Sequence, residues 1–277
     1  MSAQRSEKLN WMASHLPEGL LVDAAWLRSQ GYAPNLLAKY EASGWLTQPA
    51  HRVYMRPRGN LVWQQIVISL QTLIGRDLAV GGQTALALEG HEHYLQHTTS
   101  TIYLYGPEPP PTWLKNLKTA AFAYRKDSKL FDKARVSTEP HSLDPPAKAS
   151  AARPLGLTAL PWGQWNWPIV LSTPERAILE LLDELPERET FHQVDMIMEG
   201  LSTLSPARLQ ALLADCHNVK VKRLFFFFAD RHNHAWLKRI DRKSIDLGAG
   251  KRMLVQGGRY EPKYMITVPK DLDHGDR

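Results

Sequence analysis

Glycine and proline residues divide the first 60 residues of the chain into segments too short for anything except small helices and a hairpin. Three of these segments place apolar side chains at helical spacing: residues 5–16, 23–30 and 34–43. Asp23 can cap the second helix, and Pro34 suits the first turn of the third. Two β-prone runs, residues 45–48 and 53–56, then flank a turn that contains proline. Three helices followed by a hairpin predict a winged helix-turn-helix domain.

Longer elements begin near residue 61 and indicate a second, larger unit. The expected helices are residues 61–74, 83–88, 172–185, 205–216 and 219–231, and the expected strands are 77–82, 101–105, 253–256 and 264–268. The motif Ser172-Thr173-Pro174-Glu175 has the spacing of a capping box. The predicted fold class is therefore α+β: a winged helix-turn-helix over residues 1–60, then a mixed α/β C-terminal domain over residues 61–277, with a candidate sub-boundary near residues 140–170.

Charge is segregated along the chain, whose net charge is +6. Residues 1–60 hold seven basic and four acidic side chains, and residues 218–263 hold twelve and four, whereas residues 171–217 hold three and nine. Basic surfaces attract nucleic acid through charge and counterion release, so a phosphate-rich partner is expected. The alternative is a set of solvated helix faces.

Two broad classes of protein do not fit the composition. The longest apolar run, Leu224–Ala229, is far shorter than the ~20 residues of a membrane-spanning helix. The single cysteine, Cys216, excludes an internal disulfide and a cysteine-based zinc site. Because the first residues also lack a continuous apolar stretch, we expect a cytoplasmic protein with no membrane partner.

Polar and cationic residues expected to face outward in the first domain are candidate DNA contacts. A recognition helix presents such side chains to the major groove, and a wing presents cations to phosphate. The candidates are Arg28, Asn35, Lys39, His51, Arg52, Arg56 and Arg58. The alternative is that the same residues are merely solvated on a domain that makes protein contacts.

The Gly81-Gly82 turn before the strand at residues 101–105 has the layout of a nucleotidyltransferase. Those enzymes carry two carboxylates, one residue apart, on the strand that follows such a turn, and the carboxylates hold metal ions. This chain has Thr101 and Tyr103 at the corresponding positions, which cannot replace paired carboxylates. Two interpretations stay open: a catalytically inactive relative of that fold, or a glycine turn that permits close packing.

Other motifs that suggest chemistry fail on spacing. His91, His93 and His97 lack the H-E-x-x-H spacing of a metalloprotease. Residues 248–252 lack the first glycine and the final Ser or Thr of a phosphate-binding loop. Cys216 lies on an apolar helix face, as expected of a core thiol. We therefore predict no metal site and no cofactor.

A second basic segment follows residue 218. Its candidate surface residues are Lys220, Lys222, Arg223, Lys238, Arg239, Lys251, Arg252 and Arg259. Phe225–Phe228 interrupt them, and four consecutive phenylalanines occupy every side of a helix, so most must be buried. The cations could bind nucleic acid phosphate or an acidic protein, and the sequence does not separate these partners.

Four segments together resemble the AbiEi-type antitoxins of type IV toxin–antitoxin (abortive infection) systems. They are LLVDAAWLRSQGYAPNLLAKYEASGWLTQPAHRVYMRP, VGGQTALALEGH, STPERAILELLDELP and the tail from VKVKRLFFFF to YMITVP. The resemblance implies an N-terminal domain that binds inverted repeats upstream of its own operon and represses it. It also implies a C-terminal domain that counteracts a nucleotidyltransferase toxin without needing a stable complex with that toxin.

The resemblance assigns the DNA-contacting role to Asn35, Lys39, Arg52 and Arg56, which match the recognition helix and wing of the family. We assign the antitoxic role to the basic tail between Lys220 and Arg259, and we expect no enzymatic activity. Two alternatives remain: a winged-helix regulator whose C-terminal domain senses a ligand, and an enzyme that modifies nucleic acid. The second lacks a carboxylate pair, a metal set or an activated nucleophile at workable spacing.

Overall fold

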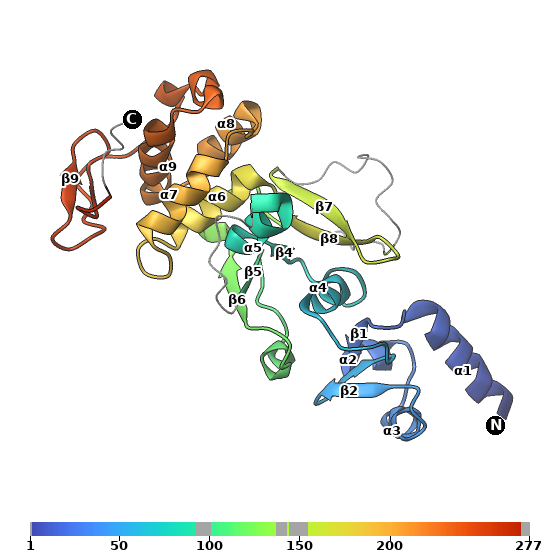
Figure 1. The fold of residues 1–277 in the computed structure, drawn as a ribbon. Coiled ribbons are helices and arrows are strands. Elements are labelled where there is room, and N and C mark those ends of the chain that lie inside the picture. Colours follow the sequence, from blue (N-terminus) through green and yellow to red (C-terminus); the bar gives the residue numbers. More distant parts are fainter. Residues whose placement is uncertain (1, 92–100, 137–142, 144–154, 273–277) are drawn as a thin grey trace.

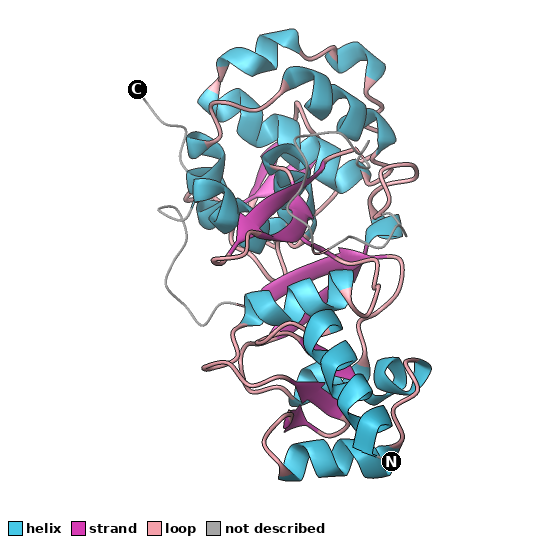
Figure 2. Ribbon diagram, turned by 90° about the vertical axis from the view of Figure 1, so that its right-hand side faces the viewer, coloured by secondary structure: helices cyan, strands magenta, loops and turns pink. Residues whose placement is uncertain are grey.

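The computed structural model describes residues 2–91, 101–136, 143 and 155–272. The molecule is elongated, with the N-terminal helices and small sheet at one end, a mixed sheet in the middle, and a helical layer beyond it (Figures 1 and 2). Helix α4 (Trp63–Thr72) lies between the N-terminal part and the mixed sheet (Figure 1). The fold is α+β, as predicted.

Residues 2–58, called the head from here on, form the predicted winged helix-turn-helix. Its elements are α1 (Ser2–His15), β1 (Leu21–Asp23), α2 (Ala24–Ser29), α3 (Pro34–Ala42), β2 (Thr47–Ala50) and β3 (Val53–Met55). Asp23 caps α2 by accepting the N–H of Trp26 at 2.8 Å, and Pro34 occupies the first turn of α3. The strands pair antiparallel in the order β1-β3-β2.

Two details of the head differ from the prediction. The hairpin turn is shorter, because Pro49 and Ala50 belong to β2 and only His51 and Arg52 form the turn. Strand β1 was not predicted, since three residues are too few to show alternation and its partner Val53–Met55 lies some thirty residues later.

The five-stranded mixed sheet has the order β6-β5-β4-β8-β7. Its strands are β4 (Ala79–Val80), β5 (Ile102–Gly106), β6 (Phe122–Lys126), β7 (Leu157–Trp162) and β8 (Trp167–Ser172). The pairs β5–β6 and β4–β8 are parallel, and β4–β5 and β7–β8 are antiparallel. Sequence analysis missed β6, β7 and β8. All six residues of β8 are buried, so it lacks the alternation that marks a half-buried strand.

Helices cover one side of this sheet, and a small hairpin follows them in the chain. They are α5 (Gly82–Leu86), α6 (Pro174–Asp183), α7 (Phe191–Gly200), α8 (Pro206–Asp215) and α9 (Val219–His232), followed by β9 (Arg259–Glu261) and β10 (Ile266–Val268). Phe225–Phe228 are all buried, as expected. The predicted strand at residues 253–256 is wrong, because the N–H groups of Leu254 and Val255 donate to the Thr267 hydroxyl instead of a neighbouring strand.

The predicted capping box at the start of α6 is also wrong, although the helix does start there. Thr173 is the N-cap without a side-chain cap bond, and Ser172 belongs to β8. Glu175 instead accepts the N–H of Ser205 and pairs with Arg208, each at 2.7 Å. The Glu175 carboxylate therefore binds residues at the start of α8 instead of the backbone at the start of α6, which it would bind in a capping box.

One hydrophobic cluster runs from the head through α4 into the sheet; it includes Leu16, Ile66 and Leu171. The N–H of Leu21 in β1 donates to the hydroxyl of Ser69 in α4 at 3.0 Å. The division of the chain at residue 60 stays a prediction. Within the described ranges, no helix has both the length and the apolar character needed to cross a membrane.

Candidate DNA-binding surface

Helix α3 turns a polar face to solvent. Leu37 and Tyr40 are buried in the head, whereas Asn35 and Lys39 are exposed. Residues four apart lie on the same face of a helix, one turn from each other, so these two side chains point the same way. The face is available to a groove of DNA, as the recognition-helix prediction requires.

The turn between β2 and β3 presents two further candidates, His51 and Arg52, both exposed. Arg52 adopts a left-handed conformation with φ of 63°, and its carbonyl oxygen accepts the N–H of Ala24 at 2.8 Å. The backbone of the turn is thus fixed against the start of α2 while the Arg52 guanidinium stays exposed. Among the described residues, the side chains of Asn35, Lys39, His51 and Arg52 make no hydrogen bond or ion pair.

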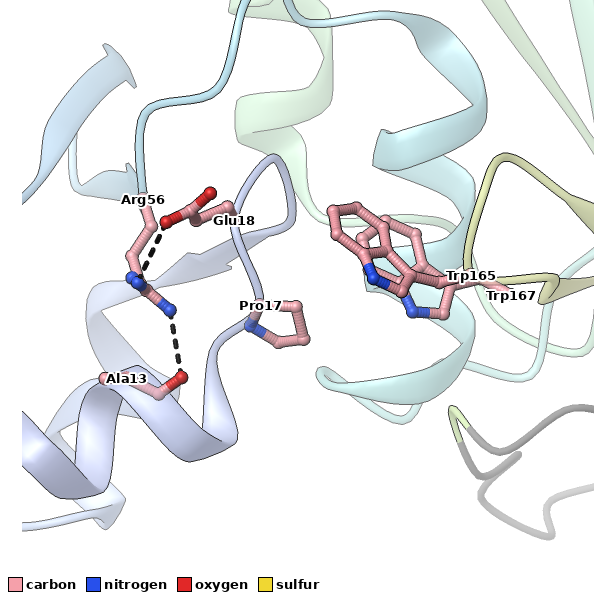
Figure 3. Close-up of a pocket in the computed structure, with 6 residues that line it drawn as sticks. All are labelled: Ala13, Pro17, Glu18, Arg56, Trp165 and Trp167. Carbon is pink, nitrogen blue, oxygen red and sulfur yellow. Dashed lines mark hydrogen bonds and ion pairs between the residues drawn. The ribbon is translucent and has the colours of Figure 1, made fainter.

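Arg56 is held by the head itself. Its guanidinium donates to the carbonyl oxygens of Ala13 at 2.9 Å and Leu16 at 3.1 Å, which belong to the last turn of α1 and the residue after it, and it pairs with Glu18 at 3.2 Å (Figure 3). Carbonyl groups at the end of a helix lack partners within the helix, and a cation there satisfies them. This predicted wing contact is therefore an internal cap.

Arg58 and Arg28 are also engaged within the chain. Arg58 contacts the second oxygen of Glu18 at 3.5 Å and lies over the ring of Trp165, 4.1 Å from the ring centroid. Arg28 is exposed, but its Nε donates to the carbonyl of Ala24 one turn earlier. The sequence pattern could not distinguish Arg58 from Arg52, because both are cations near the wing, or Arg28 from a free cation on the preceding helix.

The second basic segment also contains both cations that are engaged within the fold and cations that are exposed. Arg223 is fully buried in α9 and donates to the carbonyl oxygens of Leu247 at 2.7 Å, Gly248 at 3.1 Å and Gly250 at 2.7 Å. Burial lowers the pKa of this arginine. Lys222 is 6% exposed. Neither residue is on a surface, which corrects the prediction: both lie on sides of α9 that are packed against other elements.

Of the remaining predicted cations in this segment, Lys238, Arg239, Lys251 and Arg252 are exposed. Lys220 donates to the carbonyls of Asp183 and Leu185, and Arg259 pairs with Glu261 at 3.5 Å. We call these four exposed residues the C-terminal basic patch: Lys238 and Arg239 lie in the 3-10 helix Ala235–Arg239, and Lys251 and Arg252 follow the segment packed against the start of α9. The segment from Leu247 to Gly250 directs carbonyl groups at Arg223.

The Gly81-Gly82 turn packs against a buried carboxylate. The N–H of Gly82 donates to Glu180 at 2.9 Å, and a Cβ at Gly81 would collide with Glu180 and the ring of Tyr105. Glu180 also accepts hydrogen bonds from Arg176 and Ser172. Close packing thus accounts for Gly81, and a left-handed backbone conformation, with φ of 52°, favours glycine at position 82. The inactive-nucleotidyltransferase interpretation stays untested.

The other motifs offer no additional site among the described residues. His93 and His97 lie outside the described ranges, as does the side chain of His91. Elsewhere in those ranges, no three His, Cys, Asp or Glu side chains group as metal ligands would. Cys216 is buried, and burial raises its pKa to about 11, which fits the predicted core thiol.

Sequence reasoning missed two tryptophans that join the head to the rest of the chain. Trp165 contacts Arg58, and the indole N–H of Trp113 donates to Asp23 at 3.4 Å. No motif marks either tryptophan, because each contact joins residues about 90 or more positions apart.

Comparison with protein families covers nearly the whole chain. Residues 5–97 match the family described as the N-terminal domain of the transcriptional regulator, AbiEi antitoxin. Residues 99–269 match the family described as transcriptional regulator, AbiEi antitoxin, type IV TA system. No curated protein matches the chain. A crystal structure of the RV2827C protein from Mycobacterium tuberculosis is similar, with a TM-score of 0.53 and 15% identity over 95% of this chain and 90% of that one, a similarity of fold alone.

Proposed function

The chain belongs to the AbiEi family of antitoxins and transcriptional regulators of type IV toxin–antitoxin systems, and from this premise we propose that it represses its own operon by binding operator DNA through the head. The contact surface is the exposed face of α3 together with the β2–β3 turn. The DNA is an inverted repeat upstream of the operon, so that each half-site takes one head. Repression is steric, because a bound head blocks the promoter.

The pair Asn35 and Lys39 on α3 carries this proposal. The two side chains share an exposed helix face and make no hydrogen bond or ion pair within the described part of the chain. Asn reads adenine and Lys reads guanine or phosphate, and each good base contact provides ~1–3 kcal/mol of discrimination. His51 and Arg52 add the wing contact, where a cation neutralises phosphate.

The test compares binding of the upstream DNA by the native chain and by Lys39→Ala with Arg52→Ala over a series of salt concentrations. Each lost phosphate contact should reduce the slope of log K against log salt by about 0.9. Lys118→Ala is the matched control, since Lys118 is an exposed cation outside the head. Unchanged affinity and slope in the double variant would rule out this surface.

We also propose that the larger domain supplies the antitoxic activity, with no enzymatic step and no stable complex with the toxin, a nucleotidyltransferase in the neighbouring gene. The C-terminal basic patch, Lys238, Arg239, Lys251 and Arg252, is the surface proposed to act. Its support is the excess of twelve basic over four acidic residues between 218 and 263, together with the exposure of these four. A cytoplasmic location follows from both roles.

Cell growth tests this second role when the neighbouring gene is expressed and this chain is supplied from a separate promoter, so that repression cannot explain rescue. Rescue is expected from the native chain, and loss of rescue from a variant with all four patch residues changed to Ala. Toxicity without rescue would favour the plain regulator whose larger domain senses a ligand. Nucleotide transfer or nucleic acid cleavage by the purified chain would favour the enzyme.

A further inference from the structure

Two tryptophans from the sheet-bearing part of the chain contact the head at separate places. Trp113 lies in the 3-10 helix Thr112–Asn116, and Trp165 lies in the turn between β7 and β8. The first contacts the start of α2, and the second contacts the chain just after the wing. Trp165 is not part of the hydrophobic cluster that runs through α4, whereas Trp113 packs against it, so a change at Trp113 must keep an aromatic ring to preserve that packing.

The Trp113 contact involves Asp23, the residue that caps α2. Asp23 uses Oδ1 to accept the N–H of Trp26, which caps α2, and Oδ2 accepts the indole N–H of Trp113 at 3.4 Å. One carboxylate therefore joins the first helix of the helix-turn-helix to the larger domain. The N–H of Tyr32 donates to the carbonyl of Leu27, so the turn into α3 is fixed to α2. A movement at Asp23 would be transmitted to α3.

The Trp165 contact holds the chain segment that follows the wing. The Arg58 guanidinium covers one side of the Trp165 ring, and the ring of Trp167 stacks with it at a centroid distance of 4.8 Å and an angle of 25°. Trp167 is buried, so it fixes the stack to strand β8. Glu18 contacts both Arg56 and Arg58, and thereby joins this stack to the end of α1.

A cavity beside this stack shows that the contact is not fully packed. Its volume is about 330 Å³, and Ala13, Pro17, Glu18 and Arg56 of the head face Trp165 and Trp167 across it (Figure 3). Trp165 is 42% exposed. Because this space is open to solvent and Trp165 is partly exposed, few buried contacts hold this side of the interface, and it can open more readily than the cluster around α4.

We propose that Trp113 and Trp165 are positioning residues for DNA recognition: they hold the head at one orientation on the larger domain. The proposal rests on DNA binding by the head, as argued above. Two heads on an inverted repeat must present their α3 helices at a fixed spacing and angle. A head that samples several orientations is competent in only a fraction of molecules, and its apparent affinity falls by that fraction.

The first measurement is the distance between the head and the larger domain in the full chain. Spin labels are placed on Ala25→Cys in α2 and Ala214→Cys in α8, both exposed positions, while the native Cys216 is buried. We expect one narrow distance distribution for the parent and a broader or shifted one for Trp113→Phe with Trp165→Ala. Met196→Ala, at an exposed apolar residue of α7, is the control. An unchanged distribution in the tryptophan variant overturns the proposal.

The second measurement is operator affinity of the same variants without labels, after thermal unfolding has confirmed that they fold. We expect about a three- to tenfold loss for the tryptophan variant with an unchanged salt slope, because the same cations contact phosphate. A broadened distance distribution with unchanged affinity overturns the positioning role. If the native chain binds no operator DNA, the proposed function fails, whereas the distance measurement still decides whether the tryptophans hold the head.

Discussion

Glu180 accepts a hydrogen bond at 2.9 Å from the backbone N–H of Gly82, which lies 98 residues earlier in the chain. Arg176 pairs with the other oxygen of the same carboxylate at 2.8 Å, and both side chains are fully buried. Helix α6 is thereby fixed to the turn between β4 and α5. A buried structural ion pair therefore holds the Gly81-Gly82 turn in place.

The variant Glu180→Gln should destabilise the fold strongly. It keeps the shape of the side chain but leaves the Arg176 charge buried without its partner, which costs about 3–5 kcal/mol. Urea unfolding followed by circular dichroism gives the free energy of unfolding. Glu187→Gln, at an exposed residue, is the control and should change it little. A loss below about 1 kcal/mol for Glu180→Gln would show that the pair is not important for stability.

Replacement of Arg223 by Met should release the C-terminal hairpin without removing a nucleic acid contact. The guanidinium organises residues 247–250 through their carbonyl oxygens, and bonds of this charged kind contribute about 1.5–3 kcal/mol each. We expect faster hydrogen exchange at β9 and β10, while Lys238→Ala, at an exposed cation outside the hairpin, leaves the exchange unchanged. Equal protection in both variants would contradict this role of Arg223.

Acid should destabilise the helical layer through two aspartates. Burial disfavours ionisation of Asp195, but hydrogen bonds from His232 and Arg231 outweigh it and lower the pKa to about 2. Burial is outweighed in the same way at Asp230, where Arg242, Lys263 and Tyr264 lower the pKa to about 2. Because the pKa of an aspartate in the unfolded chain is 3.8, the stabilisation is complete above about pH 5 and is lost as the pH falls towards 2.

The loss should amount to about 2 kcal/mol for each carboxylate, as read from the free energy of unfolding at a series of pH values. In Asp195→Asn the curve should be flatter between pH 5 and pH 2, with lower stability at neutral pH. Asp132→Asn, at an exposed aspartate, should follow the native curve. An Asp195→Asn curve parallel to the native one would rule out the contribution of Asp195.

Sequence reasoning succeeded where local rules decide the structure. The cap at Asp23 and the proline at Pro34 place α2 and α3, and burial of the four phenylalanines follows from their being consecutive. It failed where a distant partner decides. Strand β1 exists because it pairs with β3, and Glu175 takes its partners from the start of α8 rather than from the expected capping box.

The candidate DNA-binding surface shows the same limit. Charge and position near the wing identified Arg52 and Arg56 together, since nothing local distinguishes them. The difference arises from α1, whose last carbonyl groups lie beside Arg56 and not beside Arg52. Only the folded head could assign an internal role to one and leave the other exposed.

This difference predicts opposite effects for the two arginines. Arg56→Ala should lower the free energy of unfolding by about 1–3 kcal/mol, because the carbonyl groups of Ala13 and Leu16 lose their donor, and should leave the salt dependence of operator binding unchanged. Arg52→Ala should leave stability within about 0.5 kcal/mol of the native value and reduce the salt slope by about one phosphate contact.

Urea unfolding and DNA titrations on both single variants separate the two effects. If Arg56→Ala reduces the salt slope at unchanged stability, Arg56 contacts DNA and its bonds to α1 break when the complex forms. If Arg52→Ala destabilises the head and leaves the slope as it was, the turn is structural, and the DNA-binding surface is confined to α3. The geometry of the two residues predicts that Arg56→Ala loses stability and keeps the salt slope, whereas Arg52→Ala keeps stability and loses part of the slope.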